Sequence, residues 1–212
     1  MKIVKGIVIA VAALVLSVFV VALLLPAEQH VERSLVINAE PETLYDLVDS
    51  FERFNEFSPW FERDPQVKTI IEGPASGVGH TMRWDSEKDD VGKGVQEIIE
   101  VDPPRMVKSR LDFGFGEPPT AAWTFERVDG GTKATWSLDS TFESDFIGRY
   151  FGVMLDGMVG PDYERGLENL KKTAEADQEK KDAELAQADA AAPPTDVADA
   201  PEVPVEEPNP VD

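Results

Sequence analysis

The chain has 212 residues, no cysteine, two histidines and a formal net charge of −21 at neutral pH. The lack of cysteine excludes disulfide bonds, thiolate catalysis and cysteine-based zinc sites. The acidic balance argues against binding to nucleic acid and against electrostatic attachment to anionic lipid, because both need patches of lysine and arginine. With so few histidines as well, we predict no metal site and no cofactor.

The charge is spread over three zones of different composition. Residues 1–30 carry +1, and residues 174–212 carry −10 because twelve acidic residues stand against two lysines, which leaves −12 for residues 31–173. The central zone has the usual size of one domain and can bury a core without a metal or a disulfide. We therefore predict a single domain over residues 31–173.

The N-terminal zone contains an apolar segment long enough to cross a bilayer. Gly6 to Leu25 is a run of twenty uncharged residues, which as a helix spans about 30 Å. Lys2 and Lys5 precede the run, so the positive-inside rule predicts a cytoplasmic N-terminus at residues 1–5. The domain would then lie outside the cytoplasm, in the periplasm of a bacterium.

A cleaved signal peptide is the alternative interpretation of this segment. Its apolar region normally has about 7–15 residues and ends in a small-x-small cleavage site. The run here is longer, and a cut after Ala27 would place leucine at the −3 position, whereas a cut after Ala22 would place valine there. The length favours an uncleaved transmembrane helix over residues 6–25. A linker at residues 26–30 would hold the domain close to the bilayer.

The domain is expected to begin with a strand and an amphipathic helix. Residues 31–37 are rich in valine, leucine and isoleucine, as strands are. Pro41 suits the first position of a helix. The apolar residues of this helix recur at i, i+3, i+4 and i+7, as Leu44, Leu47, Val48 and Phe51. An aromatic-rich corner around Pro59 follows the helix and is too short and broken for another long helix.

From residue 66 the sequence changes to short runs rich in β-branched and aromatic residues, separated by turns with glycine or proline. Because these connections are short, neighbouring strands should pair antiparallel. Together with the first strand they predict an antiparallel sheet of about seven strands. The six runs are residues 66–72, 79–85, 95–101, 106–115, 120–128 and 132–142.

A long amphipathic helix is predicted over residues 146–173, with Pro161 interrupting or kinking it. A helix after an antiparallel sheet must lay its apolar stripe on that sheet, which predicts an α+β fold. Residues 174–212 are rich in acidic residues, alanine and proline, so we expect a disordered tail whose first part, to about Ala192, can extend the helix. The stripe consists of Ile147, Phe151, Met154, Leu155 and Met158, continued by Tyr163, Leu167 and Leu170.

The order of these elements resembles the helix-grip fold of the START/polyketide-cyclase superfamily (SRPBCC) over residues 31–173. The opening strand and helices of that family are similar to HVERSLVINAEPETLYDLVDSFERFNEFSPW, and its hairpins to GVGHTMRWDS, VGKGVQEIIEVDPP and VDGGTKATW. The last helix of a membrane-anchored bacterial subset, often labelled polyketide cyclase, resembles IGRYFGVMLDGMVGPDYERGLENLKK. The resemblance implies a cavity between the sheet and the long helix. The same scaffold serves lipid carriers, hormone binders, cyclases and chaperone co-factors.

Strand alternation selects the side chains that would line such a cavity, because every second residue of a strand shares one face. Large aromatic and methionine side chains suit an apolar pocket, although a solid core uses the same residues. The predicted ligand-cavity residues are His80, Met82, Trp84, Phe113, Trp123 and Trp136 from the sheet, with Phe151, Met154, Leu155 and Met158 from the helix.

His80 is the inward candidate that could take part in chemistry, as a donor to a ligand carbonyl or as a base. The alternative is a histidine at a strand end that bonds to the backbone or to water. The sequence contains no nucleophile elbow, no histidine cluster with ligand spacing and no glycine-rich phosphate loop before a helix. We therefore predict no catalytic residue.

Three functions are compatible with this pattern. The first is a membrane-anchored binding module for an apolar small molecule or lipid, which a cavity near the bilayer could exchange with the membrane. The second is a cyclase-like or dehydratase-like enzyme that uses His80 or a cavity carboxylate. The third is an envelope protein-interaction domain that uses the acidic tail and a sheet edge. We expect the first, with the membrane contacted through residues 6–25, no nucleic acid, and no particular protein partner indicated.

Overall fold

The turn-rich part of the sequence forms a single antiparallel sheet. Its strands are β1 (Glu28–Ile37), β2 (Lys68–Glu72), β3 (Thr81–Asp85), β4 (Lys93–Asp102), β5 (Met106–Asp112), β6 (Thr120–Val128) and β7 (Gly131–Thr141). In the computed structural model, which describes residues 2–191, the order across the sheet is β1-β7-β6-β5-β4-β3-β2. Six strands thus follow one another as a meander, and β1 pairs with the last of them. The predicted seven-stranded antiparallel sheet is confirmed.

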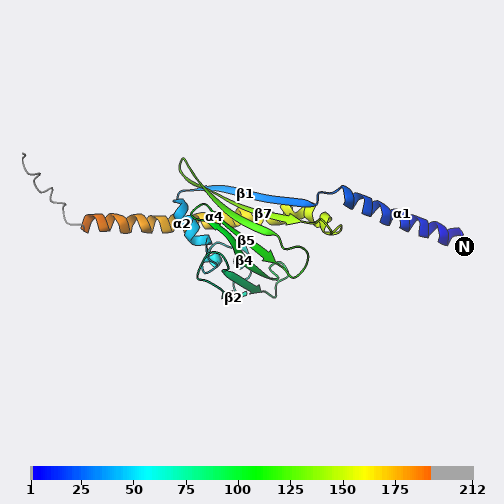
Figure 1. Cartoon of the computed structure of the whole chain (residues 1–212), viewed down its shortest axis with the longest axis horizontal. Helices are drawn as coiled ribbons and strands as arrows, with labels where there is room; N and C mark the ends of the chain where they lie inside the picture. Colours follow the sequence, from blue (N-terminus) through cyan, green and yellow to red (C-terminus); the bar gives the residue numbers. More distant parts are fainter. Residues whose placement is uncertain (1, 192–212) are drawn as a thin grey trace, which may run out of the picture.

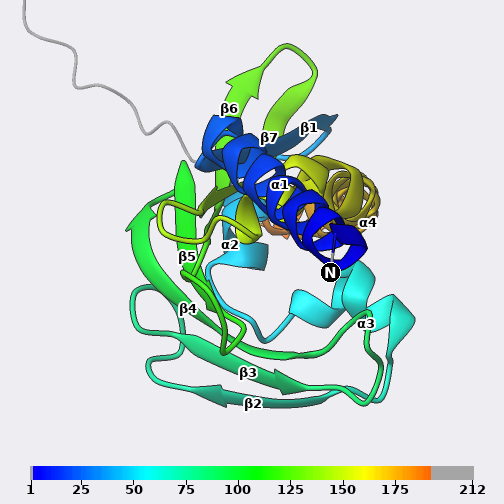
Figure 2. The same cartoon turned by 90° about the vertical axis from the view of Figure 1, so that its right-hand side faces the viewer.

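Helices lie on the concave face of this sheet and at the N-terminus of the chain. They are α1 (Lys2–Leu24), α2 (Pro41–Val48), the 3-10 turn η1 (Phe54–Glu56), α3 (Pro59–Arg63) and α4 (Gly148–Ala191). The sheet curls around α4, α2 and α3, which gives a helix-grip fold (Figure 2). α1 projects away from the domain as a separate rod (Figure 1). The predicted stripe of α2 is buried, because it packs into the core under the sheet.

The strand register brings one end of the sheet next to α1. We call this end the α1 end. It holds the start of β1, the end of β7, the β5–β6 connection and the β3–β4 connection. The Cα partners that fix it are Glu28 with Thr141, Asp139 with Thr120, Thr120 with Arg110, Asp112 with Val95, and Lys93 with Asp85.

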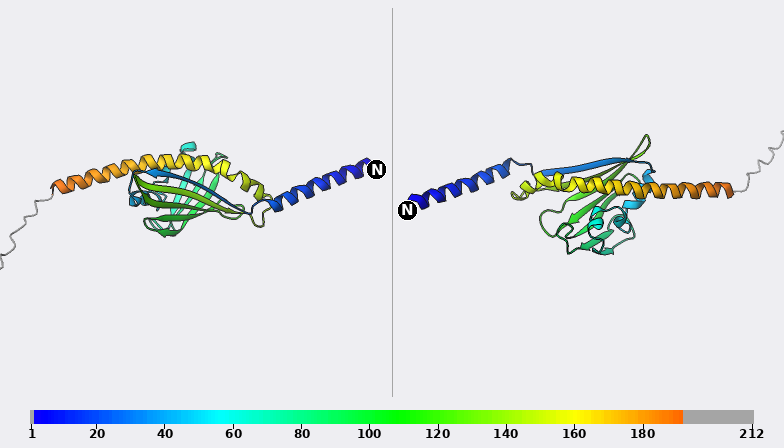
Figure 3. Two further views of the ribbon diagram at one scale, coloured as in Figure 1. Left: turned by 90° about the horizontal axis from the view of Figure 1, so that it is seen from above. Right: turned by 180° about the vertical axis from the view of Figure 1, so that it is seen from behind.

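α4 lies along β1 from the α1 end to the opposite end of the sheet. Arg33 of β1 holds it there, because the guanidinium donates to Asp156 (2.8 Å) and to Glu164 (2.7 Å). This contact lowers the pKa of the Asp156 carboxyl below its usual value. The helix is not interrupted at Pro161 but continues through it. Figure 3 shows α4 curving gently over the sheet.

Two boundaries differ from the sequence prediction. β1 starts at Glu28 rather than at residue 31, because its first residues pair with the end of β7, so the predicted linker at residues 26–30 is shorter. β5 ends at Asp112 rather than at residue 115. Gly114 and Gly116 follow it with φ of +78° and +66°, a left-handed backbone that a strand does not allow.

The helix beyond residue 173 is part of the domain, in contrast to the predicted tail boundary at residue 174. Ala174 is fully buried. Asp177 accepts a hydrogen bond from Arg53 (2.5 Å), and Gln178 accepts one from the Thr43 hydroxyl (2.8 Å). These contacts join α4 to α2 and to the segment before η1. The remainder of the predicted tail, residues 192–212, lies outside the described residues.

Truncations of the C-terminus should separate the packed part of α4 from its free part. Removing residues 183–212 should change the thermal midpoint by less than about 2 °C, because residues 183–188 are exposed and the composition of the remainder predicts few buried contacts. Removing residues 174–212 should lower it by about 5 °C or more, because Ala174, Asp177 and Gln178 are lost. The measurement is a thermal melt of the two truncated chains beside the full chain. Equal midpoints for both truncations would contradict a structural role for residues 174–182.

Candidate functional site

A stack of aromatic rings bridges the sheet and α4. Trp123 and Trp136 are cross-strand partners on β6 and β7, and their rings stack with centroids 4.2 Å apart. Tyr163 of α4 stacks on the other side of Trp136 at 4.0 Å and 3°. Trp60 of α3 meets Trp136 edge to face at 5.8 Å. Because all three stacked rings are buried, they fill the centre of the space between sheet and helix.

Burial affects the polar groups in and near this stack. Burial raises the pKa of the Tyr163 phenol above its usual value, so Tyr163 stays neutral at physiological pH. Within residues 2–191, the buried side-chain atoms without a hydrogen-bond partner are Ser58 Oγ and Trp136 Nε1. An unpaired buried donor costs about 1–3 kcal/mol. The unpaired indole N–H of Trp136 is thus a cost that the packing of the stack offsets.

His80 is buried and fully engaged with the backbone. Its Nε2 accepts the N–H of Phe51 (2.9 Å), and its Nδ1 donates to the carbonyl oxygen of Pro74 (2.7 Å). The ring thus ties the segment after α2 to the turn before β3. Both ring nitrogens are used, so His80 has neither a free donor for a ligand nor a free base.

One carboxyl lies near His80. Burial raises the pKa of Asp49 above its usual value, and the negative charge of Asp46 adds to the rise, while the Ser76 hydroxyl and His80 oppose it. A carboxyl of this kind is a candidate for acid–base chemistry. It lies at the end of the sheet opposite α1, where β2 ends and β3 starts.

The inner face of the sheet is less covered at the α1 end, where half-buried apolar side chains form what we call the open rim. Trp84 lies over Gly94 of the neighbouring strand, donates its Nε1–H to the carbonyl of Val91 (3.3 Å) and meets Phe113 edge to face at 5.8 Å. α4 packs mainly on β1, so on this side of the sheet it contributes only side chains at its edge (Figure 2). The open rim consists of Trp84, Leu111 and Phe113 from the sheet, with Leu155 and Val159 from α4.

Strand alternation placed most of the sheet residues correctly. His80, Met82, Trp123 and Trp136 are buried, and Trp84 is half-buried on the same face. Phe113 differs, because it lies just beyond β5 in the loop that contains Gly114 and is 40% exposed. It still contacts Trp84.

The prediction for the first half of α4 was wrong. Phe151, Met154 and Met158 point away from the sheet, with 61%, 59% and 58% of each residue exposed. The face turned to the sheet carries glycines instead, because α4 approaches β1 and β7 too closely for larger side chains. A Cβ on Gly152 would lie 2.9 Å from Cγ of Gln29. Leu155 lies at the edge of this inward face and is half-buried.

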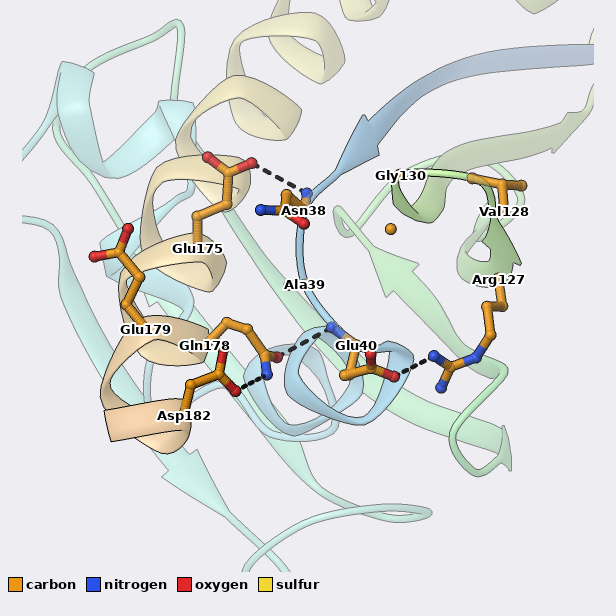
Figure 4. A pocket seen from close by; sticks show the side chains of 11 residues that line it. Asn38, Ala39, Glu40, Arg127, Val128, Gly130, Glu175, Gln178, Glu179 and Asp182 are labelled. Atoms are coloured by element: carbon orange, nitrogen blue, oxygen red, sulfur yellow. Dashed lines mark hydrogen bonds and ion pairs between the residues drawn. The ribbon is translucent and has the colours of Figure 1, made fainter. Parts of the chain in front are cut away.

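A pocket of about 500 Å³ lies at the opposite end of the domain, away from the predicted cavity (Figure 4). Two hydrogen bonds cross it: the backbone N–H of Glu40 donates to Oε1 of Gln178 (3.1 Å), and the backbone N–H of Asn38 donates to Oε1 of Glu175 (3.1 Å). Arg127 forms an ion pair with Glu40 at its other side. Seven of the eleven lining residues are polar or charged, and four of these are acidic, which does not suit an apolar ligand. Over residues 2–191 no group of three or more histidine or acidic side chains is arranged to hold a metal ion.

Comparison with known proteins identifies the fold and a family. Residues 28–175 match the family model described as polyketide cyclase / dehydrase and lipid transport. The di-domain ARO/CYC protein BexL from the BE-7585A biosynthetic pathway is 18% identical with a TM-score of 0.53, over 70% of this chain and 50% of that chain. The di-domain ARO/CYC protein StfQ from the steffimycin pathway is 15% identical with a TM-score of 0.51, over 71% and 51%.

A single-domain structure is similar over almost its whole length. The solution structure of KanY is 17% identical with a TM-score of 0.51, over 69% of this chain and 98% of that chain. This chain thus spans about half the length of the two di-domain proteins. At these identities the likenesses establish the fold alone. A search of curated protein sequences gave no significant match.

Two glycines of α4 provide a test of the close packing. A Cβ on Gly166 would lie 2.6 Å from Cζ3 of Trp136, so Gly166→Ala should push the aromatic stack apart and cost about 1–3 kcal/mol of stability. Gly157 has no neighbour within 4 Å of its Cβ position, so Gly157→Ala should stabilise the helix by up to about 1 kcal/mol. Denaturant unfolding of both variants gives the comparison. Equal effects of the two substitutions would argue against the stack.

Proposed function

Because the chain belongs to the polyketide cyclase / dehydrase and lipid transport family, we propose that it binds an apolar small molecule or lipid on the inner face of its sheet while α1 anchors it in a membrane. The family fold is that of SRPBCC-type hydrophobic-ligand binders and cyclases. The observation that carries the proposal is the open rim, where Trp84, Leu111, Leu155 and Val159 remain half-buried and Phe113 is exposed. An apolar ligand would complete their burial.

The chemistry of the inner layer fits an apolar ligand with at most a few polar groups. Trp84, Leu111 and Phe113 offer apolar surface from the sheet, and Leu155 and Val159 offer it from α4. On the polar side, the Nε1–H of Trp84 donates to the carbonyl of Val91 (3.3 Å), so the indole leaves no unpaired donor on the rim. Apolar walls with a few polar groups are the usual composition of such sites.

Anchoring is supported by the surface of α1. Ile3–Leu24 is a helix of 22 residues with a mean hydropathy of 3.3 and hardly any buried surface. An exposed apolar helix of this length is stable in lipid, and the same properties occur in signal sequences. We propose the anchor, with the lysines of the N-terminus in the cytoplasm and the domain in the periplasm. The open rim would then lie at the end of the domain that faces the bilayer.

A cyclase or dehydratase activity is the second candidate. It is favoured by Asp49, whose pKa is raised by burial beside His80. Against it, both nitrogens of His80 are engaged, and Asp49 lies at the end of the sheet opposite the open rim. A binding function does not require His80 or Asp49 to transfer a proton.

Ligand binding can be tested on the purified full chain by mass spectrometry of its solvent extract. We expect an apolar molecule at a constant ratio to protein. Trp84→Ala should reduce the retained amount several-fold, because Trp84 forms part of the open rim. Ile70→Ala is the matched control, since Ile70 is an exposed apolar residue outside the rim and should retain the ligand. An empty extract from the wild-type chain, and no rise of its thermal midpoint with added fatty acid, would defeat the binding proposal.

The anchor can be tested on membranes of cells that express the full chain. We expect the protein to stay in the membrane fraction after an alkaline wash, to be digested by protease added from the outside, and to keep its apolar N-terminal run. A mature N-terminus after Ala22 or Ala27 would identify the segment as a cleaved signal peptide instead.

A further inference from the structure

The start of α4 carries an apolar stripe that the domain leaves uncovered. Phe151, Met154 and Met158 are spaced i, i+3 and i+7, which puts them on one face of α4, and Ile147 immediately precedes the first residue of the helix. Ile147 is 74% exposed, and the other three are more than half exposed. We call these four residues the outer stripe. Such a set of large exposed apolar residues marks an interaction surface.

The outer stripe lies beside the C-terminal end of α1. The hydroxyl of Tyr150 donates to the carbonyl oxygen of Val18 (2.6 Å), and the ring of Phe146 lies 5.0 Å from that of Phe19. Val18 is seven residues before the end of the apolar run at Leu25, or about 10 Å along the helix. The first turn of α4 therefore reaches the level of the apolar run itself.

Arg149 and Asp145 fix this arrangement. The Arg149 guanidinium donates to the carbonyl oxygens of Phe142 (3.1 Å), Glu143 (2.9 Å) and Ala22 (3.3 Å). It thereby joins the end of the sheet to the last turn of α1. Asp145 caps α4 by accepting the N–H of Gly148 (2.7 Å). The outer stripe is thus held in a defined position relative to α1.

We propose that the outer stripe lies in the lipid leaflet that surrounds the C-terminal end of α1, so that α4 attaches the domain to the bilayer surface as a second, peripheral contact. The inference rests on the proposed anchor. Its occupant is lipid, because the stripe continues the surface that α1 already offers to lipid. Ile147 and Phe151 lie nearest α1 and are deepest in the leaflet. Met158 is about 10 Å beyond Phe151 along the helix and lies at the leaflet boundary.

The charges around the stripe indicate how it attaches. Residues 142–160 contain three acidic residues and one arginine, and Arg149 is already engaged with backbone carbonyls. Anionic lipid therefore offers no attraction to this surface. Burial of the apolar side chains is the driving force, and the contact should form equally well on neutral phosphatidylcholine and at high salt.

The cysteine-free sequence allows a direct measurement of depth. Single cysteines at Phe151→Cys, Met154→Cys and Met158→Cys can carry a nitroxide label on the full chain in phosphatidylcholine vesicles. Glu168→Cys is the control, because Glu168 is exposed on α4 but lies beyond the stripe. We expect the ratio of oxygen to nickel-chelate accessibility to be highest at 151, to fall through 154 to 158, and to be several-fold lower at 168. High salt should leave this order unchanged.

Three results would overturn the inference, and they differ in their consequence for the proposed anchor. Nickel access at 151 equal to that at 168, in protein that resists alkaline extraction, would leave the anchor intact and remove the stripe from the lipid. Spin–spin broadening at 151 that disappears on dilution with lipid would assign the stripe to a second copy of the chain. Extraction of the chain by alkali would remove both the anchor and the inference.

Discussion

The close approach of α4 to β1 is the constraint on which the other features of this domain depend. Glycines at the contact let the helix lie against the strand, and Arg33 fixes its position through two carboxylates of α4. Because the helix follows β1 and β7, it covers one side of the curled sheet and leaves the open rim on the other side. The same contact turns the large apolar residues at the start of α4 outward.

Much of the architecture follows from patterns that depend on local geometry. Alternation in β3, β6 and β7 identified the buried residues, because strand side chains alternate between faces whatever the tertiary context. Pro41 marked the start of α2. The predicted run of residues 106–115 is too long because it includes Gly114, although Gly114 and Gly116 so close together already indicate a turn rather than a strand.

The face of α4 could not be chosen by hydrophobicity alone. Met158 and Tyr163 were assigned to one stripe, but five residues correspond to about 140° around a helix, so they lie on different faces. Gly152, Gly160 and Gly166 lie within about 60° of Tyr163 around the helix, and Leu155 lies within about 80° of it. Only the three-dimensional contact shows that these glycines mark the packed face. The hydrogen bonds of His80 to two loops could not be predicted either, because neither loop conformation follows from its sequence.

α4 also acts as a spacer. With 44 residues it is about 66 Å long, and its first turn is fixed beside α1 at one end of the domain. Its last described turns extend beyond the sheet at the opposite end (Figures 1 and 3). If α1 spans a bilayer, the chain after Ala191 starts several nanometres from the lipid headgroups. The length of one helix therefore sets how far Ala191 stands from the membrane.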